Sequence, residues 1–454
     1  MASTGVGETL LAALQASVSV LLVISYGGLA AKLGILSPDS TKAVSKVCVR
    51  MFLPALLVTK LGAELDAGSA GKYGIIVLWG LLAHFISFLI GTLGHFVFKM
   101  PDWVTVAVMF NNTASYPLLL IGALQQTGIL ESLLVKGETT AEAIERANSY
   151  FLVFSTISNC LTFAVGPRLI DTEHAPEPDS DSDSDLQHDE NSEDEPQANE
   201  ETGLLNGDRL AVPDFHNPFG DHGSFFPSTR KPSTVPSGTS RGHDKRRASF
   251  VPRKRWVKLS PRTKWWLVFL SDFLNAPLLG AIAGAVIGLS PPLHRAFFND
   301  TQHGGIFTAW LTASLQRIGT LFVPLPVVIA GTSLYTAYKN TKEKGQDKPK
   351  GLPWITVSYI MIVRFVIWPV AAIGFVYLLA SRTSVLGDDP MLWFTMMLMP
   401  CGPPAMKLIT LVQVSNSGDE EEGIIAKLLM ISYLISPVLS FTVVGSLRAA
   451  QEAV

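Results

Sequence analysis

Long apolar stretches dominate this sequence and limit the folds that are open to it. About ten of them reach the roughly 20 mostly apolar residues that a helix needs to cross a bilayer. Hydrophobic residues make up 48% of the 454 positions and charged residues only 16%. A polar segment from about Asp171 to Lys264 dilutes these averages, so the remainder is far more apolar than a soluble domain. The sequence predicts an all-α polytopic membrane protein with ten transmembrane helices.

Two of these stretches are interrupted in the middle by residues that break a helix. The interruptions are residues 111–117, which read NNTASYP, and residues 400–404, which read PCGPP. Proline lacks an N–H group and clashes with the preceding turn, so an α-helix breaks there. Inside a bilayer the freed backbone groups must find protein or a watery cavity as partners. We predict that helices 4 and 9 are broken at these points and cross in the membrane, as in transporters.

Short matches recur in the same order in both halves of the chain. Ser37-Pro38 matches Ser290-Pro291, and Phe52-Leu53-Pro54 matches Phe322-Val323-Pro324. Each half holds five predicted helices, an odd number, so the second half must enter the membrane from the opposite side. We therefore predict two inverted five-helix repeats, at residues 1–170 and 264–454, joined by a loop at 171–263.

The connecting loop is highly polar. Aspartate and glutamate are dense from Asp171 to Glu201, and such a segment cannot bury enough apolar surface to offset its chain entropy, so we expect disorder. Arg246-Arg247-Ala248-Ser249 resembles a site for a basic-directed kinase, so the loop is either a solvated tether or a target of regulatory phosphorylation. The distribution of Lys and Arg in the short loops places it in the cytosol, with both termini on the other side.

The helix breaks are the predicted binding site. A half-helix N-terminus carries unpaired N–H groups and about half a positive charge, which suits an anionic group such as a carboxylate. Neutral polar side chains beside it can bind a polar group without the cost of burying a charge. Alternatively, these side chains only satisfy the broken backbone. The candidate substrate-binding residues are Asn111, Asn112, Thr113, Ser115, Pro117, Asn275, Cys401, Gly402, Pro403, Pro404 and Lys407.

Charged residues within apolar stretches are costly and are functional candidates. Lys407 is the counter-ion of the bound anion, or it snorkels to the membrane surface or pairs with a protein acid such as Asp272. Arg364 is a second cation that needs a partner. His84 and His95 are expected to be structural.

Several functions lack their sequence signatures. The chain has no GxxxxGK[ST] loop, no HExxH motif and no Ser/His/Asp arrangement, so we expect neither direct ATP use nor an enzyme. Its three cysteines form no CxxC pattern, so we expect no metal and no cofactor. We expect no nucleic acid partner.

The sequence resembles the auxin efflux carrier family, which includes the PIN and PIN-LIKES transporters. The resemblance covers all ten predicted helices and rests on five motifs: Phe52-Leu53-Pro54, residues 111–117, Leu274-Asn275-Ala276-Pro277, Val363-Arg364-Phe365 and residues 401–406, CGPPAM. The chain length and the Asp/Ser-rich loop resemble those of a fungal member closer to PIN-LIKES. The resemblance implies crossed helices 4 and 9, a scaffold domain and a mobile transport domain, and transport of indole-3-acetic acid.

We therefore expect a secondary transporter of a small organic anion, auxin or another organic acid, that works by alternating access. The alternative is a non-transporting membrane sensor that signals through the cytosolic loop. The resemblance places the chain in the endoplasmic reticulum membrane, with the plasma membrane and the vacuole as alternatives. Besides the substrate and the lipid bilayer, we consider two partners: a second copy of the chain, as a homodimer, and a kinase acting on the loop.

Overall fold

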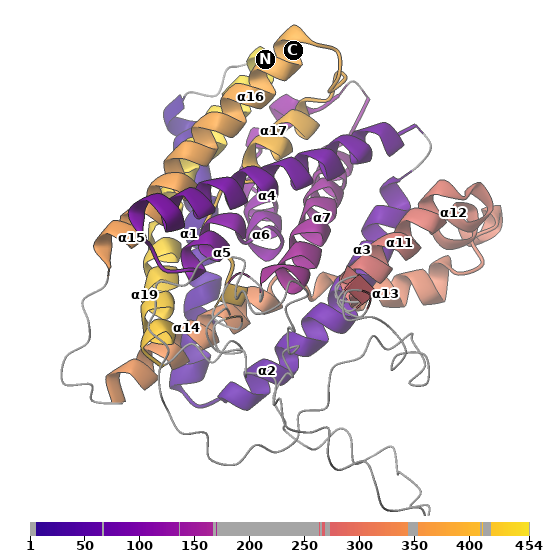
Figure 1. Ribbon diagram of the computed structural model, residues 1–454. Coiled ribbons are helices and arrows are strands. Elements are labelled where there is room, and N and C mark those ends of the chain that lie inside the picture. The colour runs from indigo at the N-terminus through magenta and orange to yellow at the C-terminus, as the bar shows by residue number, and fades with distance from the viewer. Residues whose placement is uncertain are drawn as a thin grey trace, which may run out of the picture.

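The computed structural model shows a helical protein (Figure 1). It describes residues 6–453 except 66–67, 136, 167–168, 170–262, 264–265, 268–272, 344–352, 409–410 and 412–418. The predicted loop at 171–263 therefore lies outside the described residues except for its last position, and the candidate partner Asp272 lies outside them as well.

The α-helices, in chain order, are α1 (Val6–Lys32), α2 (Pro38–Val47), α3 (Leu53–Glu64), α4 (Ala70–Phe98), α5 (Trp103–Met109), α6 (Ser115–Gln125), α7 (Thr140–Ala164), α11 (Ala276–Leu289), α12 (Pro291–Phe298), α13 (Ala313–Thr320), α14 (Leu325–Glu343), α15 (Trp354–Ile362), α16 (Trp368–Arg382), α17 (Pro390–Leu398), α19 (Asp419–Ile435) and α20 (Leu439–Glu452). Short helical turns accompany them: η1 (Cys48–Phe52), η2 (Ile129–Leu133), η3 (Thr301–His303), η4 (Thr308–Thr312), η5 (Val363–Ile367) and η6 (Ser436–Val438).

Five continuous helical segments are long and apolar enough to cross a membrane, within the part of the chain that the structure describes. They are Val6–Lys32, Ala70–Phe98, Thr308–Thr336, Trp354–Arg382 and Gly423–Glu452. This confirms a polytopic α-helical membrane protein. Ten spans in two inverted repeats stay a prediction.

Two prolines inside predicted helices widen the helix without ending it. The π-helical turn η1 precedes Pro54, and the π-helical turn η5 precedes Pro369 in the same way. A proline ring cannot donate to the carbonyl four residues earlier and collides with it. A wider turn relieves that collision, so the chain continues as helix on both sides.

Glycines allow two pairs of helices to approach closely. The helix α11 packs along α3, and α1 packs along α14. A Cβ atom at Gly288 would lie 2.3 Å from the carbonyl oxygen of Leu65, and one at Gly27 would lie 1.9 Å from that of Val328. Small residues at helix contacts are the usual way in which membrane helices gain van der Waals contact.

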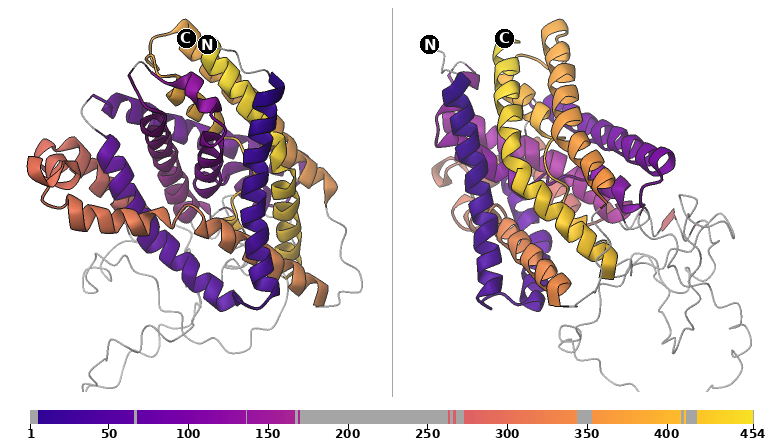
Figure 2. Two further views of the ribbon diagram at one scale, coloured as in Figure 1. Left: turned by 180° about the vertical axis from the view of Figure 1, so that it is seen from behind. Right: turned by 90° about the vertical axis from the view of Figure 1, so that its left-hand side faces the viewer.

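The remaining helices enclose the two breaks. The helix α4 packs on α5 and α7, and α17 packs on α7, α16 and α20. Every residue of α5 is buried, and every residue of α17 except Pro390 is buried. The ion pair of Lys60 with Glu145 joins α3 to α7. Figure 2 shows that both termini lie at the same end of the molecule, where α1 meets α20.

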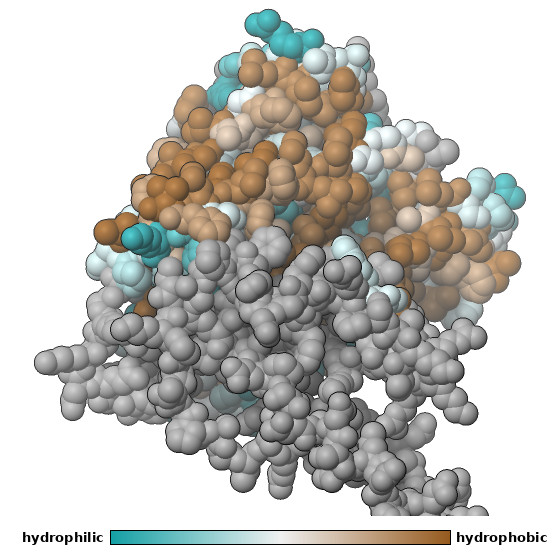
Figure 3. All heavy atoms as spheres, in the orientation of Figure 1, coloured by the Kyte–Doolittle hydropathy of each residue, from teal (hydrophilic) through white to brown (hydrophobic). Residues whose placement is uncertain are grey.

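A broad hydrophobic surface covers the face formed by α4, α15 and α16 (Figure 3). Its exposed side chains include Leu78 and Phe85 of α4 and Val370 and Leu378 of α16. Hydrophilic residues gather beyond it at the end that holds the termini. An exposed apolar surface of this extent on spanning helices is what contact with lipid tails requires.

Candidate functional site

The predicted break in helix 4 is present between α5 and α6. The helix α5 ends at Met109, Phe110 is extended, and α6 begins at Ser115. Proline at position 117 occupies the third position of α6, where its missing N–H group is not needed because the first-turn N–H groups of a helix have no intrahelical partner. The break therefore lies just before the proline, in the asparagine-rich segment.

The predicted break in helix 9 follows α17. This helix ends at Leu398, and the chain turns through residues 399–405. Gly402 has a φ of 117°, in the region that favours glycine because other residues carry a Cβ atom. Only the first residues after this turn are described, up to Leu408 and again at 411.

The two breaks pair with each other through their backbones. We call the two paired breaks, residues 110–114 and 399–405, the crossover. Asn111 and Pro404 form an antiparallel bridge. The N–H of Asn112 donates to the carbonyl of Pro403 at 3.1 Å, and the N–H of Ala405 donates to the carbonyl of Phe110 at 2.9 Å. Backbone groups freed by the two interruptions thus satisfy one another, as a site without water demands.

The side chain of Asn111 supports the second break. Its Nδ2 atom donates to the carbonyls of Met399 and Cys401, both at 2.9 Å. Met399 is the C-cap of α17 and Cys401 lies in the turn that follows, where carbonyls have no helical partner of their own. Asn111 is 3% exposed, so it acts here by satisfying the broken backbone, one of the two roles expected from the sequence.

Asn112 faces a different set of groups. Its Nδ2 donates to the phenol oxygen of Tyr433 at 2.9 Å, and its Oδ1 accepts from the N–H of Tyr116 at 3.4 Å. The phenol of Tyr433 in turn donates to the carbonyl of Pro404 at 3.4 Å. Asn112 is only partly buried, which makes it the crossover asparagine more accessible to a ligand.

Four of the other candidate residues are buried at the two breaks, and Asn275 lies just before α11. Thr113, Ser115 and Pro117 are buried along the start of α6, and Cys401 is a buried free thiol that donates to the carbonyl of Met397 at 3.2 Å. Asn275 was expected early in helix 6, where it would either line the cavity or cap backbone; it is the N-cap of α11 and accepts from the N–H of Leu278 at 3.0 Å.

Cys160 connects Asn275 with Lys407. Its thiol donates to Asn275 Oδ1 at 3.7 Å, and Lys407 lies near it. Cys160 lies in α7. Asn275 and Lys407, which follows the second break, therefore both approach the same part of that helix. Whether these residues bind substrate stays a prediction.

Both histidines of α4 bond to backbone carbonyls. His84 Nδ1 lies 2.7 Å from the carbonyl oxygen of Gly80, and His95 Nδ1 lies 2.8 Å from that of Met100. Their contacts agree with the structural role expected for them. No three His, Cys, Asp or Glu side chains gather as metal ligands among the described residues.

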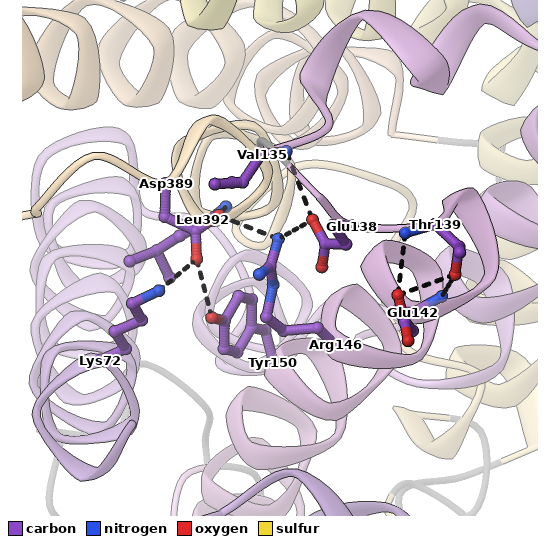
Figure 4. A network of polar contacts seen from close by, with 9 residues as sticks. All are labelled: Lys72, Val135, Glu138, Thr139, Glu142, Arg146, Tyr150, Asp389 and Leu392. Atoms are coloured by element: carbon purple, nitrogen blue, oxygen red, sulfur yellow. Dashed lines mark hydrogen bonds and ion pairs between the residues drawn. The ribbon is translucent and has the colours of Figure 1, made fainter. Parts of the chain in front are cut away.

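A polar cluster holds the N-terminal end of α17 in place (Figure 4). Asp389 caps α17 by accepting from the N–H of Leu392 at 3.1 Å. Lys72 of α4 lies 2.8 Å from its carboxylate, Arg146 of α7 lies 3.4 Å away, and Tyr150 donates to it at 3.1 Å. We call Asp389, Lys72, Arg146 and Tyr150 the Asp389 cluster.

Asp389 precedes α17 and lies outside the helical spans. Burial raises the pKa of its carboxyl, but the charges of Arg146 and Lys72 and the hydrogen bonds of Lys72 and Leu392 outweigh burial, and the pKa falls below its ordinary value of 3.8. An ionised Asp389 thus fixes α17 between α4 and α7. The nearby bond from Trp79 Nε1 to the carbonyl of Met396, at 3.0 Å, adds to this attachment.

Sequence reasoning missed Tyr433 and the Asp389 cluster. A single tyrosine in an apolar helix is more often a packing or interfacial residue than a site residue. Nothing in the sequence indicated which cations would surround Asp389.

Comparison with known proteins identifies the family. The sequence matches the membrane transport protein family over residues 12–443. The chain belongs to this family. It is therefore a transporter rather than an enzyme, and both breaks lie within the matched region.

Three related proteins are similar in sequence to this chain over different shares of its length. An uncharacterized transporter of Schizosaccharomyces pombe is 25% identical over 91% of this chain and 90% of its own length. An uncharacterized transporter of Saccharomyces cerevisiae is 22% identical over 97% of this chain and 96% of its own. Protein PIN-LIKES 5 of Arabidopsis thaliana is 29% identical over 38% of this chain and 39% of its own. These similarities support a fungal PIN-like transporter.

Proposed function

We propose that this membrane transport protein is a secondary transporter of a small organic anion, with an apolar ring and a carboxylate as in auxin, indole-3-acetic acid. The observation that carries the proposal is the pairing of two helix breaks, through Asn111 and Pro404, inside a bundle with a lipid-facing surface. Breaks of this kind cost backbone hydrogen bonds, so a protein keeps them where they serve a purpose.

The chemistry of the crossover favours an anion over a cation. The N-terminus of α6 begins at the crossover, and unpaired N–H groups there favour negative charge. The polar side chains nearest to it, Asn112, Thr113 and Ser115, are neutral. The surrounding apolar residues, among them Phe110, Leu118 and Leu439, suit a ring.

The proposal includes the topology and the setting. Ten spans in two inverted five-helix repeats place helices 4 and 9 at the pseudosymmetry axis. Alternating access arises when helices around the crossover move relative to the α1–α14 and α3–α11 pairs. The central loop faces the cytosol, where a kinase can reach it, and the protein resides in the endoplasmic reticulum membrane, as a homodimer in one version of the proposal.

Flux into proteoliposomes tests the function. Purified protein is reconstituted, and uptake of labelled indole-3-acetate and a panel of other organic acids is measured with and without a proton gradient. We expect saturable uptake of at least one acid. The variant Asn112→Ala should reduce it severalfold, because it removes the accessible polar group of the crossover.

The matched control is Gln302→Ala, which removes an exposed amide far from the crossover along the chain and should leave uptake unchanged. Equal uptake by the wild type, Asn112→Ala and empty liposomes for every acid would contradict the transporter proposal. Binding without uptake would instead favour a sensor.

A further inference from the structure

Arg364 is a buried cation beside the second break. It lies in the π-helical turn η5 and is 1% exposed, although it carries one of the largest side chains in the interior. Single π-helical turns occur often at functional sites, because the extra residue changes which side chains face inward.

One nitrogen of Arg364 is engaged by the second break. Its Nη1 atom donates to the carbonyl of Pro400 at 3.0 Å. This carbonyl lies just beyond the C-terminal end of α17, where the partial charge of a helix is negative. The bond places the guanidinium against the crossover and compensates part of its charge.

The other edge of the guanidinium is unused. Arg364 Nε and Nη2 are buried and have no hydrogen-bond partner among the described residues. No carboxylate forms an ion pair with Arg364 in the described ranges either; Glu138, Glu145 and Asp389 pair with other cations. Buried unpaired donors and buried uncompensated charges are each costly, so their persistence points to a partner that arrives from outside the fold.

The unused edge has the geometry of a carboxylate receptor. Nε and Nη2 present two parallel N–H groups, which match the two oxygens of a carboxylate in a bidentate pair. Cys401 and Tyr433 also lie near the guanidinium. Tyr433 bonds to Asn112 at 2.9 Å, which links the surroundings of Arg364 to the accessible polar residue of the crossover.

We infer that the Nε/Nη2 edge of Arg364 receives the carboxylate of the transported anion. This inference rests on the proposed function and deepens it, since it names the charge that selects an anion. In this proposal Asn112, which is bonded to Tyr433, holds the ligand beside Arg364. Selectivity for acids over neutral analogues then comes from one residue rather than from helix ends alone.

Equilibrium binding to purified protein tests the inference, with labelled indole-3-acetate and its neutral isostere indole-3-acetamide as probes. The wild type should prefer the acid. Arg364→Gln should weaken binding of the acid at least tenfold, about the effect of losing one charged hydrogen-bonded pair, and leave binding of the amide nearly unchanged. Arg364→Lys should fall between them, because an ammonium keeps the charge but not the paired donors.

The control is Arg382→Gln, which removes an exposed arginine from the last turn of α16 and should bind both probes as the wild type does. If Arg364→Gln does not fold, the Lys variant and the wild-type preference for the acid decide. A folded Arg364→Gln that keeps the preference, or a wild type that binds acid and amide equally, would overturn the inference while leaving transport intact. A wild type that neither binds nor transports any acid would overturn the proposed function as well.

Discussion

The side-chain amide of Asn112 donates to the phenol oxygen of Tyr433 at 2.9 Å, across a separation of 321 residues. The bond joins the first break to α19, and the phenol continues to the carbonyl of Pro404 in the second break. One tyrosine thus touches both halves of the crossover and determines which way Asn112 faces.

Tyr433→Phe should therefore release Asn112 without breaking the crossover. We expect severalfold weaker binding of the transported acid and a loss of about 1 kcal/mol in the free energy of unfolding, the usual contribution of one hydrogen bond. Binding assays and thermal unfolding in detergent check the two effects. Tyr26→Phe, which alters an exposed tyrosine of α1, is the control, and unchanged binding in Tyr433→Phe would speak against a site role.

Asn111→Ala should destabilise the protein more than it affects selectivity. It removes both bonds to the carbonyls of Met399 and Cys401 in a buried place, and each lost buried bond costs about 1–3 kcal/mol. Asn159→Ala is a matched control, because that buried amide donates only to Ser155 of its own helix. Thermal unfolding should rank Asn111→Ala well below Asn159→Ala; the reverse order would show that the breaks are held by other contacts.

Gly402→Ala tests how much strain the backbone conformation at the second break imposes on a residue other than glycine. A Cβ atom there would meet only Leu439, at 3.9 Å, but φ is 117°, so the cost is conformational and amounts to about 1–3 kcal/mol. Gly374→Ala, in the exposed interior of α16 with nothing within 4 Å, should be neutral or stabilising by up to about 1 kcal/mol. Unfolding temperatures of the two variants provide the test, and equal values would contradict it.

The Asp389 cluster predicts how stability changes with pH. The folded pKa of Asp389 lies below its ordinary value of 3.8, so its contribution is complete above that unfolded value and is lost as pH falls through the folded pKa. The unfolding temperature of the wild type should drop below about pH 4 in part for this reason.

Asp389→Asn should be less stable at neutral pH and should lack that component of the acid transition. Asp388→Asn, which changes the exposed neighbouring carboxylate, should follow the wild-type profile. Thermal unfolding measured from pH 7 down to about pH 3 checks this. An acid transition of full size in Asp389→Asn would show that the cluster does not carry the effect.

Sequence patterns located the breaks because local chemistry causes them. Pro117, Pro403 and Pro404 cannot sit in a continuous helix, and Gly402 adopts a backbone conformation that other residues avoid. The apolar stretches likewise predicted a polytopic helical protein, since their length is set by the bilayer. Pro54 and Pro369 show the limit of this reasoning, because a π-helical turn absorbs each proline and the helix continues.

The sequence by itself determined that this chain enters a membrane and that two of its helices break, because apolar length and proline geometry act over a few neighbouring residues. Only the tertiary structure decided that Asn111 binds the carbonyls of the second break, that Tyr433 orients Asn112, and that Lys72 and Arg146 surround Asp389. These contacts join residues up to several hundred positions apart. Partner choice at such separations depends on how helices pack, and one sequence carries no local signal of it.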